Sequence, residues 1–165
     1  MPITYEPIAT STLTSTAASV TFSSIPSTYT DLILVISGRV SASVGNNASG
    51  LRFNGDSGNN YSMVRLTGDG SAASTDRTTA TYAGWAFIAN STVSEVTPVV
   101  YNIQNYVNTT TNKVVLGRGS SASSLISATA SMWRNTAAIT SIEVIQSSTT
   151  WIVGSTFTLF GVKSA

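Results

Sequence analysis

The residue types that most often carry catalysis are scarce in this chain. It has no histidine, which is the commonest general base at neutral pH, and no cysteine, so a thiolate can act neither as nucleophile nor as metal ligand. Asp56, Asp69 and Asp76 lie beside Gly, Ser or Thr, where aspartate usually stabilises turns through local hydrogen bonds. We therefore expect no enzyme activity and no catalytic residue. A glycosidase-type pair would have to come from Glu6, Asp31, Asp56, Asp69, Asp76, Glu95 and Glu143.

Other short motifs lack the context that their chemistry requires. No G-x-S-x-G nucleophile motif is present. Neither Gly68-Asp69-Gly70 nor Gly117-Arg118-Gly119 precedes a predicted helix, so we interpret both as turns at strand ends and not as phosphate loops. The segment 56–60 offers oxygen ligands but lacks the spacing and terminal glutamate of a calcium loop. We interpret it as a turn and expect no metal and no cofactor.

The aromatic residues leave two interpretations open. Aromatic rings stack on sugar rings, so a group of them on a surface predicts a carbohydrate platform. In a β-sandwich, however, most large aromatic side chains fill the core, and we favour this second interpretation. The residues concerned are Trp85, Trp133, Trp151, Tyr61, Tyr82, Tyr101 and Tyr106.

Composition limits the possible partners. The chain has 165 residues, 42% hydrophobic and only 9% charged, with a net charge of +1, whereas an ordinary domain is about 25% charged. A nearly neutral chain has no field to attract nucleic acid or an anionic membrane, so we expect neither partner. We also expect no export signal and no membrane span, because neither apolar pattern occurs. Ser, Thr and Asn must keep the surface hydrated, which suits proteins that pack against copies of themselves.

Hydrophobic alternation predicts strands throughout and helices nowhere. Residues 51–70 are expected to form a hairpin, because two alternating runs flank an Asn-Gly-Asp turn. Residues 31–40 are apolar on both faces, which predicts a strand buried between two layers. Residues 1–13 are expected to form an extended arm or an edge strand, and 41–50 and 71–76 to form loops. The other expected strands are 18–25, 78–89, 93–107 (bent or divided at Pro98), 113–116, 125–134, 139–146 and 151–163, the last ending inside a sheet.

Many short strands separated by turns predict an all-β sandwich or barrel. We expect one domain over residues 1–165, with a jelly-roll-like β-sandwich of about eight to ten antiparallel strands. That count exceeds the usual seven of an immunoglobulin-like sandwich, which is why we favour the jelly roll.

Three stretches together resemble a known family. They are 25–32, IPSTYTDL; 51–56, LRFNGD, followed by Asn60-Tyr61-Ser62; and 154–162, GSTFTLFGV. They resemble short β-structured virion proteins of tailed bacteriophages, often labelled as tail fibre, minor structural or head decoration proteins. The resemblance runs from about Tyr5 to the end. It brings no catalytic residues with it.

The resemblance implies a structural protein of the virion, made in the host cytoplasm and assembled as a homotrimer. The chain contains no repetitive shaft, so we expect a capsid decoration or cement protein that binds the major capsid protein, with the arm 1–13 reaching a neighbour. The alternative is a receptor-binding module of a tail fibre or spike. In that case loops such as 41–50 or 71–76 would touch host polysaccharide.

Overall fold

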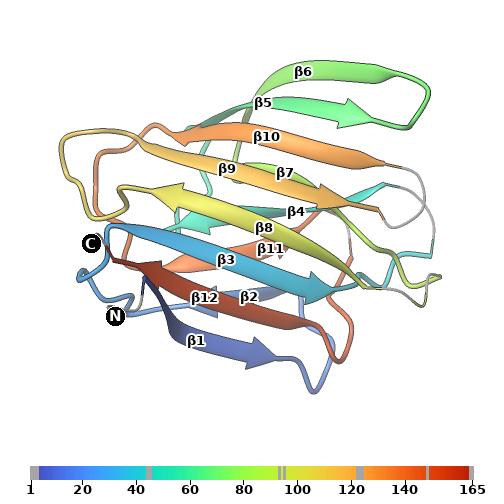
Figure 1. Cartoon of the computed structure of the whole chain (residues 1–165), viewed down its shortest axis with the longest axis horizontal. Helices are drawn as coiled ribbons and strands as arrows, with labels where there is room; N and C mark the ends of the chain where they lie inside the picture. The colour runs from blue at the N-terminus through green and yellow to red at the C-terminus, as the bar shows by residue number, and fades with distance from the viewer. Residues whose placement is uncertain are drawn as a thin grey trace.

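The computed structural model describes residues 4–43, 46–92, 94, 96–121, 125–147 and 149–163. The regular secondary structure in these ranges consists of β-strands alone, and the strands form two sheets (Figure 1). The large sheet contains, in spatial order, β1 (Tyr5–Thr12), β12 (Thr156–Val162), β3 (Asp31–Gly38), β8 (Thr97–Gln104), β9 (Lys113–Ser120), β10 (Ile126–Trp133), β5 (Tyr61–Gly68) and β6 (Ala73–Ala80). The small sheet contains β2 (Ser19–Phe22), β11 (Ile142–Gln146), β4 (Asn47–Phe53) and β7 (Ala83–Ile88).

This arrangement confirms the all-β fold class and is consistent with a β-sandwich, but it does not confirm jelly-roll connectivity. All ladders between named strands are antiparallel. The described residues form twelve strands, more than the expected eight to ten. One of the additional strands is β6, which includes part of the expected loop 71–76. It pairs with β5 over its full length but is exposed up to Thr79, so it has no hydrophobic alternation to reveal it.

The core lies between the two sheets. In Figure 1 the small sheet lies behind the large one, and buried side chains from both form one hydrophobic cluster. Strand β3 contributes Leu32, Leu34 and Ile36, all fully buried. Its other face is only partly covered at Ile33 and Val35. The prediction of a strand buried on both faces was therefore wrong, because nothing in the described residues covers the outer face of the large sheet.

The expected hairpin at 51–70 was also wrong. Strand β4 belongs to the small sheet and β5 to the large one, so this segment crosses from one layer to the other. The turn itself is as predicted, since Asn54 and Gly55 both have positive φ values, 52° and 73°. Alternation shows which side chains face the core but not from which layer. Phe53 and Tyr61 therefore meet across the core, both packing on Trp133 with ring centroids 5.5 and 6.3 Å away.

Strand β10 turns its polar side chains inward. Ser127, Thr129 and Ser131 are buried, whereas Ile126, Ala128 and Ala130 are exposed. The cause is β7, an edge strand of the small sheet, whose backbone N–H groups point at β10 and have no strand partner there. Gly84 N donates to Ser131 Oγ (2.9 Å), and Phe87 N donates to Ser127 Oγ (3.0 Å). Hydroxyl groups thus complete the hydrogen bonding of a buried sheet edge.

Two glycines of β9 also make room for close neighbours, the backbone of Phe87 on β7 and the ring of Tyr101 on β8. A Cβ on Gly119 would lie 2.4 Å from Phe87 O, and one on Gly117 would lie 2.8 Å from Tyr101 Cε1. The segment 117–119 lies within β9, so its interpretation as a strand-end turn was wrong. The equivalent interpretation of 68–70 was right: Gly68 ends β5, and the carboxylate of Asp69 accepts from Ser71 N and Ala72 N.

Of the two structures expected for residues 1–13, the edge strand is present. Strand β1 pairs with β12 along its length, with a bulge between Pro7 and Ala9, while residues 1–3 lie outside the described residues. Strand β12 itself lies between β1 and β3, as expected for the last strand. The Glu6–Lys163 ion pair (2.6 Å) links the two ends of the described chain.

Raising the pH above 10 is expected to destabilise the fold through Tyr61. This side chain is fully buried; its hydroxyl donates to Asp56 O (2.9 Å) and accepts from Phe53 N (3.1 Å). Burial raises the pKa of Tyr61 from 10.0 to about 12. The unfolded chain therefore loses this proton first. Stability that is present below pH 10 should be lost towards pH 12, at about 1.4 kcal/mol per pH unit.

Urea unfolding from neutral pH to pH 12 measures this loss. Tyr61→Phe should be less stable at neutral pH, because Phe53 N loses its acceptor, but should lose stability more gradually above pH 10. Tyr5→Phe is the control, since Tyr5 is 56% exposed. Equal slopes for the wild type and Tyr61→Phe would contradict this account.

Candidate functional site

The carboxylates of the described residues are all engaged in local structure. Asp56 is an example: its Oδ2 accepts from Trp133 Nε1 (2.7 Å), and its Oδ1 accepts from Gly58 N (2.9 Å). These hydrogen bonds, led by that from Trp133, lower the pKa of Asp56. Glu95 lies outside the described residues. The other pairings are Glu6 with Lys163, Asp31 with Asn105 N, Asp69 with Ser71 N and Ala72 N, Asp76 with Arg65, and Glu143 with Arg52.

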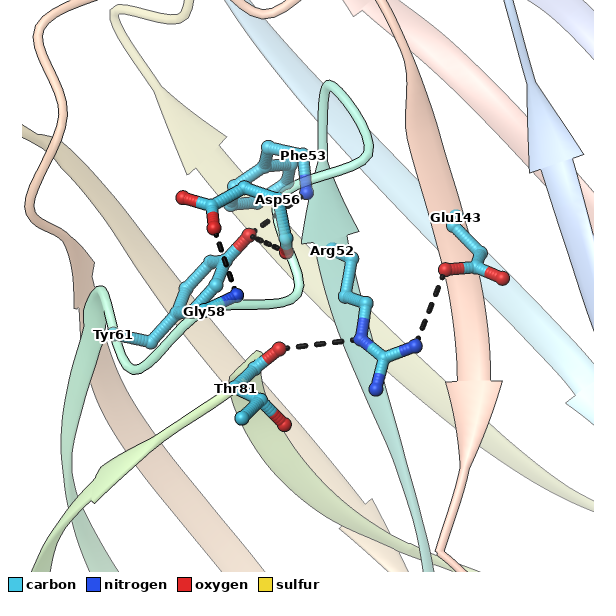
Figure 2. A network of polar contacts seen from close by, with 7 residues as sticks. All are labelled: Arg52, Phe53, Asp56, Gly58, Tyr61, Thr81 and Glu143. Carbon is cyan, nitrogen blue, oxygen red and sulfur yellow. Dashed lines mark hydrogen bonds and ion pairs between the residues drawn. The ribbon is translucent and has the colours of Figure 1, made fainter.

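The segment 56–60 is a turn closed by Asp56. Figure 2 shows Asp56 bonded to Gly58, with the Tyr61 hydroxyl donating to the backbone of Asp56. Asn60 Nδ2 donates to both carboxylate oxygens at 3.0 Å. Within the described ranges, no three acidic side chains come together in a way that could hold a metal ion.

The outer face of the large sheet is apolar across several strands. Leu116, Ala130 and Val64 lie opposite one another on β9, β10 and β5, and Arg118, Ala128 and Leu66 form the next row. The second row continues into β8 and β3 through Val100 and Val35, and the first row through Asn102 and Ile33. Most of the large apolar side chains exposed in the described residues belong to this face: Val64 (51%), Leu66 (50%), Val114 (38%), Leu116 (42%) and Ile126 (66%).

A groove follows β10 along this face. Alanines at 128 and 130 are small, whereas Val64 and Leu66 on one side and Leu116 on the other are large. The result is a hollow of about 440 Å³ lined by these residues, which we call the β10 groove. A second hollow of about 280 Å³ lies farther along the same strand, beside Val114 and Met132.

The charge at the β10 groove is positive. Arg118 lines it, and Arg77 on β6 lies opposite Val64. Neither guanidinium has a carboxylate partner among the described residues, in contrast to Arg65, which binds Asp76 at 2.9 Å. The groove is therefore a mainly apolar surface with uncompensated arginines at its margin.

The seven aromatic residues fall into two groups. Trp133, Trp151, Tyr61, Tyr101 and Tyr106 are fully or almost fully buried, as the core interpretation predicts. Tyr82 and Trp85 are only partly buried, and their ring centroids lie 6.0 Å apart. They line a hollow of about 200 Å³ on the small sheet, which we call the Tyr82 pocket.

Arg52 fixes the wall of the Tyr82 pocket. It lies on β4 opposite Glu143 of β11 and forms an ion pair with it (3.5 Å). Figure 2 shows the same guanidinium reaching the turn before β7, where Nε donates to Thr81 O (3.2 Å). Arg52 therefore joins two strands to the turn that carries Tyr82. Among the residues that the structure describes, no carboxylate lines this pocket or the hollows along β10.

Comparisons with known proteins add no identity, since no family model, curated protein or solved structure matches this chain. In the described part of the chain, no helix has the length and hydropathy needed to cross a membrane.

The sequence alone did not predict the β10 groove, although two segments contain a pattern that is consistent with it. Residues 61–66 carry apolar side chains at both odd and even positions. In 125–133 the even positions are apolar, although Trp133 occupies an odd one. A strand with one face in the core and apolar residues on the other has a second surface to cover. Which strands bring these surfaces together depends on sheet order, which alternation does not encode.

Proposed function

We propose that this protein is a non-enzymatic structural protein of a tailed-phage virion, made in the host cytoplasm and assembled as a homotrimer that decorates the capsid by binding the major capsid protein. The assembly part is supported by one observation, the apolar outer face with its β10 groove. The virion setting is supported by the resemblance of the three stretches named above. The partnering of every described carboxylate agrees with a role without catalysis.

The size of the outer face suits a subunit interface. Five strands about 4.8 Å apart, with eight residues of about 3.3 Å each, give a flat area of about 600 Å². The largest apolar patch of a typical monomer is about 300–600 Å², and a standard interface buries about 800 Å² per partner. The face from β3 to β5 is therefore comparable with a subunit contact.

The charge on this face favours a cyclic assembly. A two-fold contact centred on the β10 groove would bring two copies of Arg118 together with no carboxylate between them, which is unfavourable. In a ring, the groove of one subunit meets a different surface of the next. A trimer is such a ring.

The location of the protein in purified particles tests the capsid role. Capsids and tails are separated, and the protein is quantified in each by mass spectrometry. A decoration protein should be found in the capsid fraction at high copy number. Presence in the tail fraction alone, at few copies, would reject this role.

A second function, recognition of host surface polysaccharide by a tail fibre or spike module, is favoured by a different observation. The Tyr82 pocket offers two partly exposed aromatic rings beside hydrogen-bonding groups. Tail location would agree with this function and not with decoration.

A further inference from the structure

We propose that the Tyr82 pocket binds a single neutral pyranose ring of a glycan. This inference rests on the second proposed function and gives its site and ligand class. It is independent of the β10 groove, which lies on the other sheet.

The pocket has a rigid floor and an aromatic wall. Strand β4 supplies the floor at Ser49 and Gly50, and Tyr82 lies directly over it: a Cβ on Gly50 would be 2.6 Å from Tyr82 Cδ2. Trp85 continues the wall, and Arg65 lies over its ring at 4.9 Å from the centroid. The rings are thus held in place before any ligand arrives, which lowers the cost of binding.

Polar groups surround these rings on the other sides. Ser147 and Gln146 at the end of β11 line the pocket opposite β7, and Arg52 closes one end. A ring hydroxyl is both a donor and an acceptor, so a sugar matches aromatic surface and mixed polar groups at once.

Volume and charge define the ligand further. About 200 Å³ is the space of six or seven liquid water molecules, enough for one sugar ring and too small for an oligosaccharide. The two nearby cations are already paired, Arg52 with Glu143 and Arg65 with Asp76. A neutral ring therefore fits better than an acidic one.

Saturation-transfer NMR on the purified full chain tests this assignment. The probes are the methyl glycosides of glucose, galactose and mannose, N-acetylglucosamine, and glucuronic acid as the acidic comparison. We expect at least one neutral sugar to bind with a dissociation constant of the order of 1 mM, and more tightly than glucuronic acid. Tyr82→Ala should weaken binding by about tenfold, the loss expected for one aromatic contact.

Two further variants separate the pocket from the fold. Tyr82→Phe keeps the ring and should retain most of the affinity, whereas Tyr5→Ala removes an exposed aromatic residue on β1 and should change nothing. Circular dichroism confirms that each variant is folded. Absence of saturable binding by the wild type, preference for glucuronic acid, or equal affinity of a folded Tyr82→Ala would overturn the proposal.

Host polysaccharide distinguishes the pocket from the receptor function. If the protein binds the polysaccharide and folded Tyr82→Ala binds it equally well, the pocket assignment fails and the receptor function stands. If the pocket binds a sugar but the protein occurs only on capsids, the receptor function fails and the pocket stands.

Discussion

The double variant Ser127→Ala, Ser131→Ala is expected to have a free energy of unfolding about 2–6 kcal/mol lower than that of the wild type. Each hydroxyl is the acceptor for a buried backbone N–H of β7, at Phe87 and Gly84. A buried donor that loses its partner costs about 1–3 kcal/mol. Making this part of the core more hydrophobic should therefore weaken it.

Urea unfolding monitored by tryptophan fluorescence measures this change. The matched control is Ser15→Ala, Ser27→Ala, which makes the same exchange at two exposed residues outside the β10 groove and should change stability by less than about 0.5 kcal/mol. If the alanine double variant were as stable as the wild type, β7 would not depend on these hydroxyls.

The double variant Leu66→Lys, Leu116→Lys is expected to convert the assembled protein into monomers. Both side chains line the β10 groove, and each is about half exposed in the single chain (50% and 42%). Lysine is accommodated there while the face is in water. It would carry an unpaired charge into the contact when a second subunit covers the face, beside Arg118, which costs several kcal/mol per charge.

Light scattering coupled to size-exclusion chromatography gives the mass of each form. The wild type should elute as a trimer, and the variant as a monomer whose circular dichroism spectrum still shows the β-fold. Tyr5→Lys, Val153→Lys adds the same charge at two exposed apolar residues outside the groove and should remain trimeric. A monomeric wild type, or a variant that still assembles, would contradict the proposed interface.

Alternation predicted the strands with an inward apolar face and missed those without one. Leu51 and Phe53 share a buried face as expected, and both are inaccessible to solvent. Residues 71–76 are expected to form a loop and 78–89 one strand, whereas the structure pairs Ala73–Ala80 with β5 as β6 and begins β7 at Ala83. Propensity carries no information about a partner that is distant in sequence or lies in a particular layer.

The polar interior of β10 shows the same limit. From hydrophobicity alone, Ile126, Ala128 and Ala130 would be placed inside. The structure reverses this, because Trp133 shares a face with Ser127 and Ser131, and the edge of β7 requires their oxygens. The direction of β10 is thus set by a hydrogen-bonding need on another strand, which a single sequence does not display.

The candidate sites were partly foreseeable. The sequence left open whether the aromatic residues form a core or a sugar platform; in the structure Tyr82 and Trp85 are partly exposed and the other five named residues lie in the core. Tyr82 and Trp85 stay near the surface because Gly84, with a φ value of 68°, bends the chain between them and leaves no room for a side chain against Tyr101. Such a bend depends on tertiary contacts and cannot be read from residue types.

The hydrogen bonds between β7 and β10 should also respond to temperature differently from the apolar core. Attraction between apolar side chains weakens on cooling, because its driving force near room temperature is entropic. The bonds from Gly84 and Phe87 to serine oxygens do not share that origin. On cooling, the apolar packing around Trp133 should therefore weaken before these hydrogen bonds do. The hydrogen bonds between β7 and β10 would then continue to hold the two sheets together.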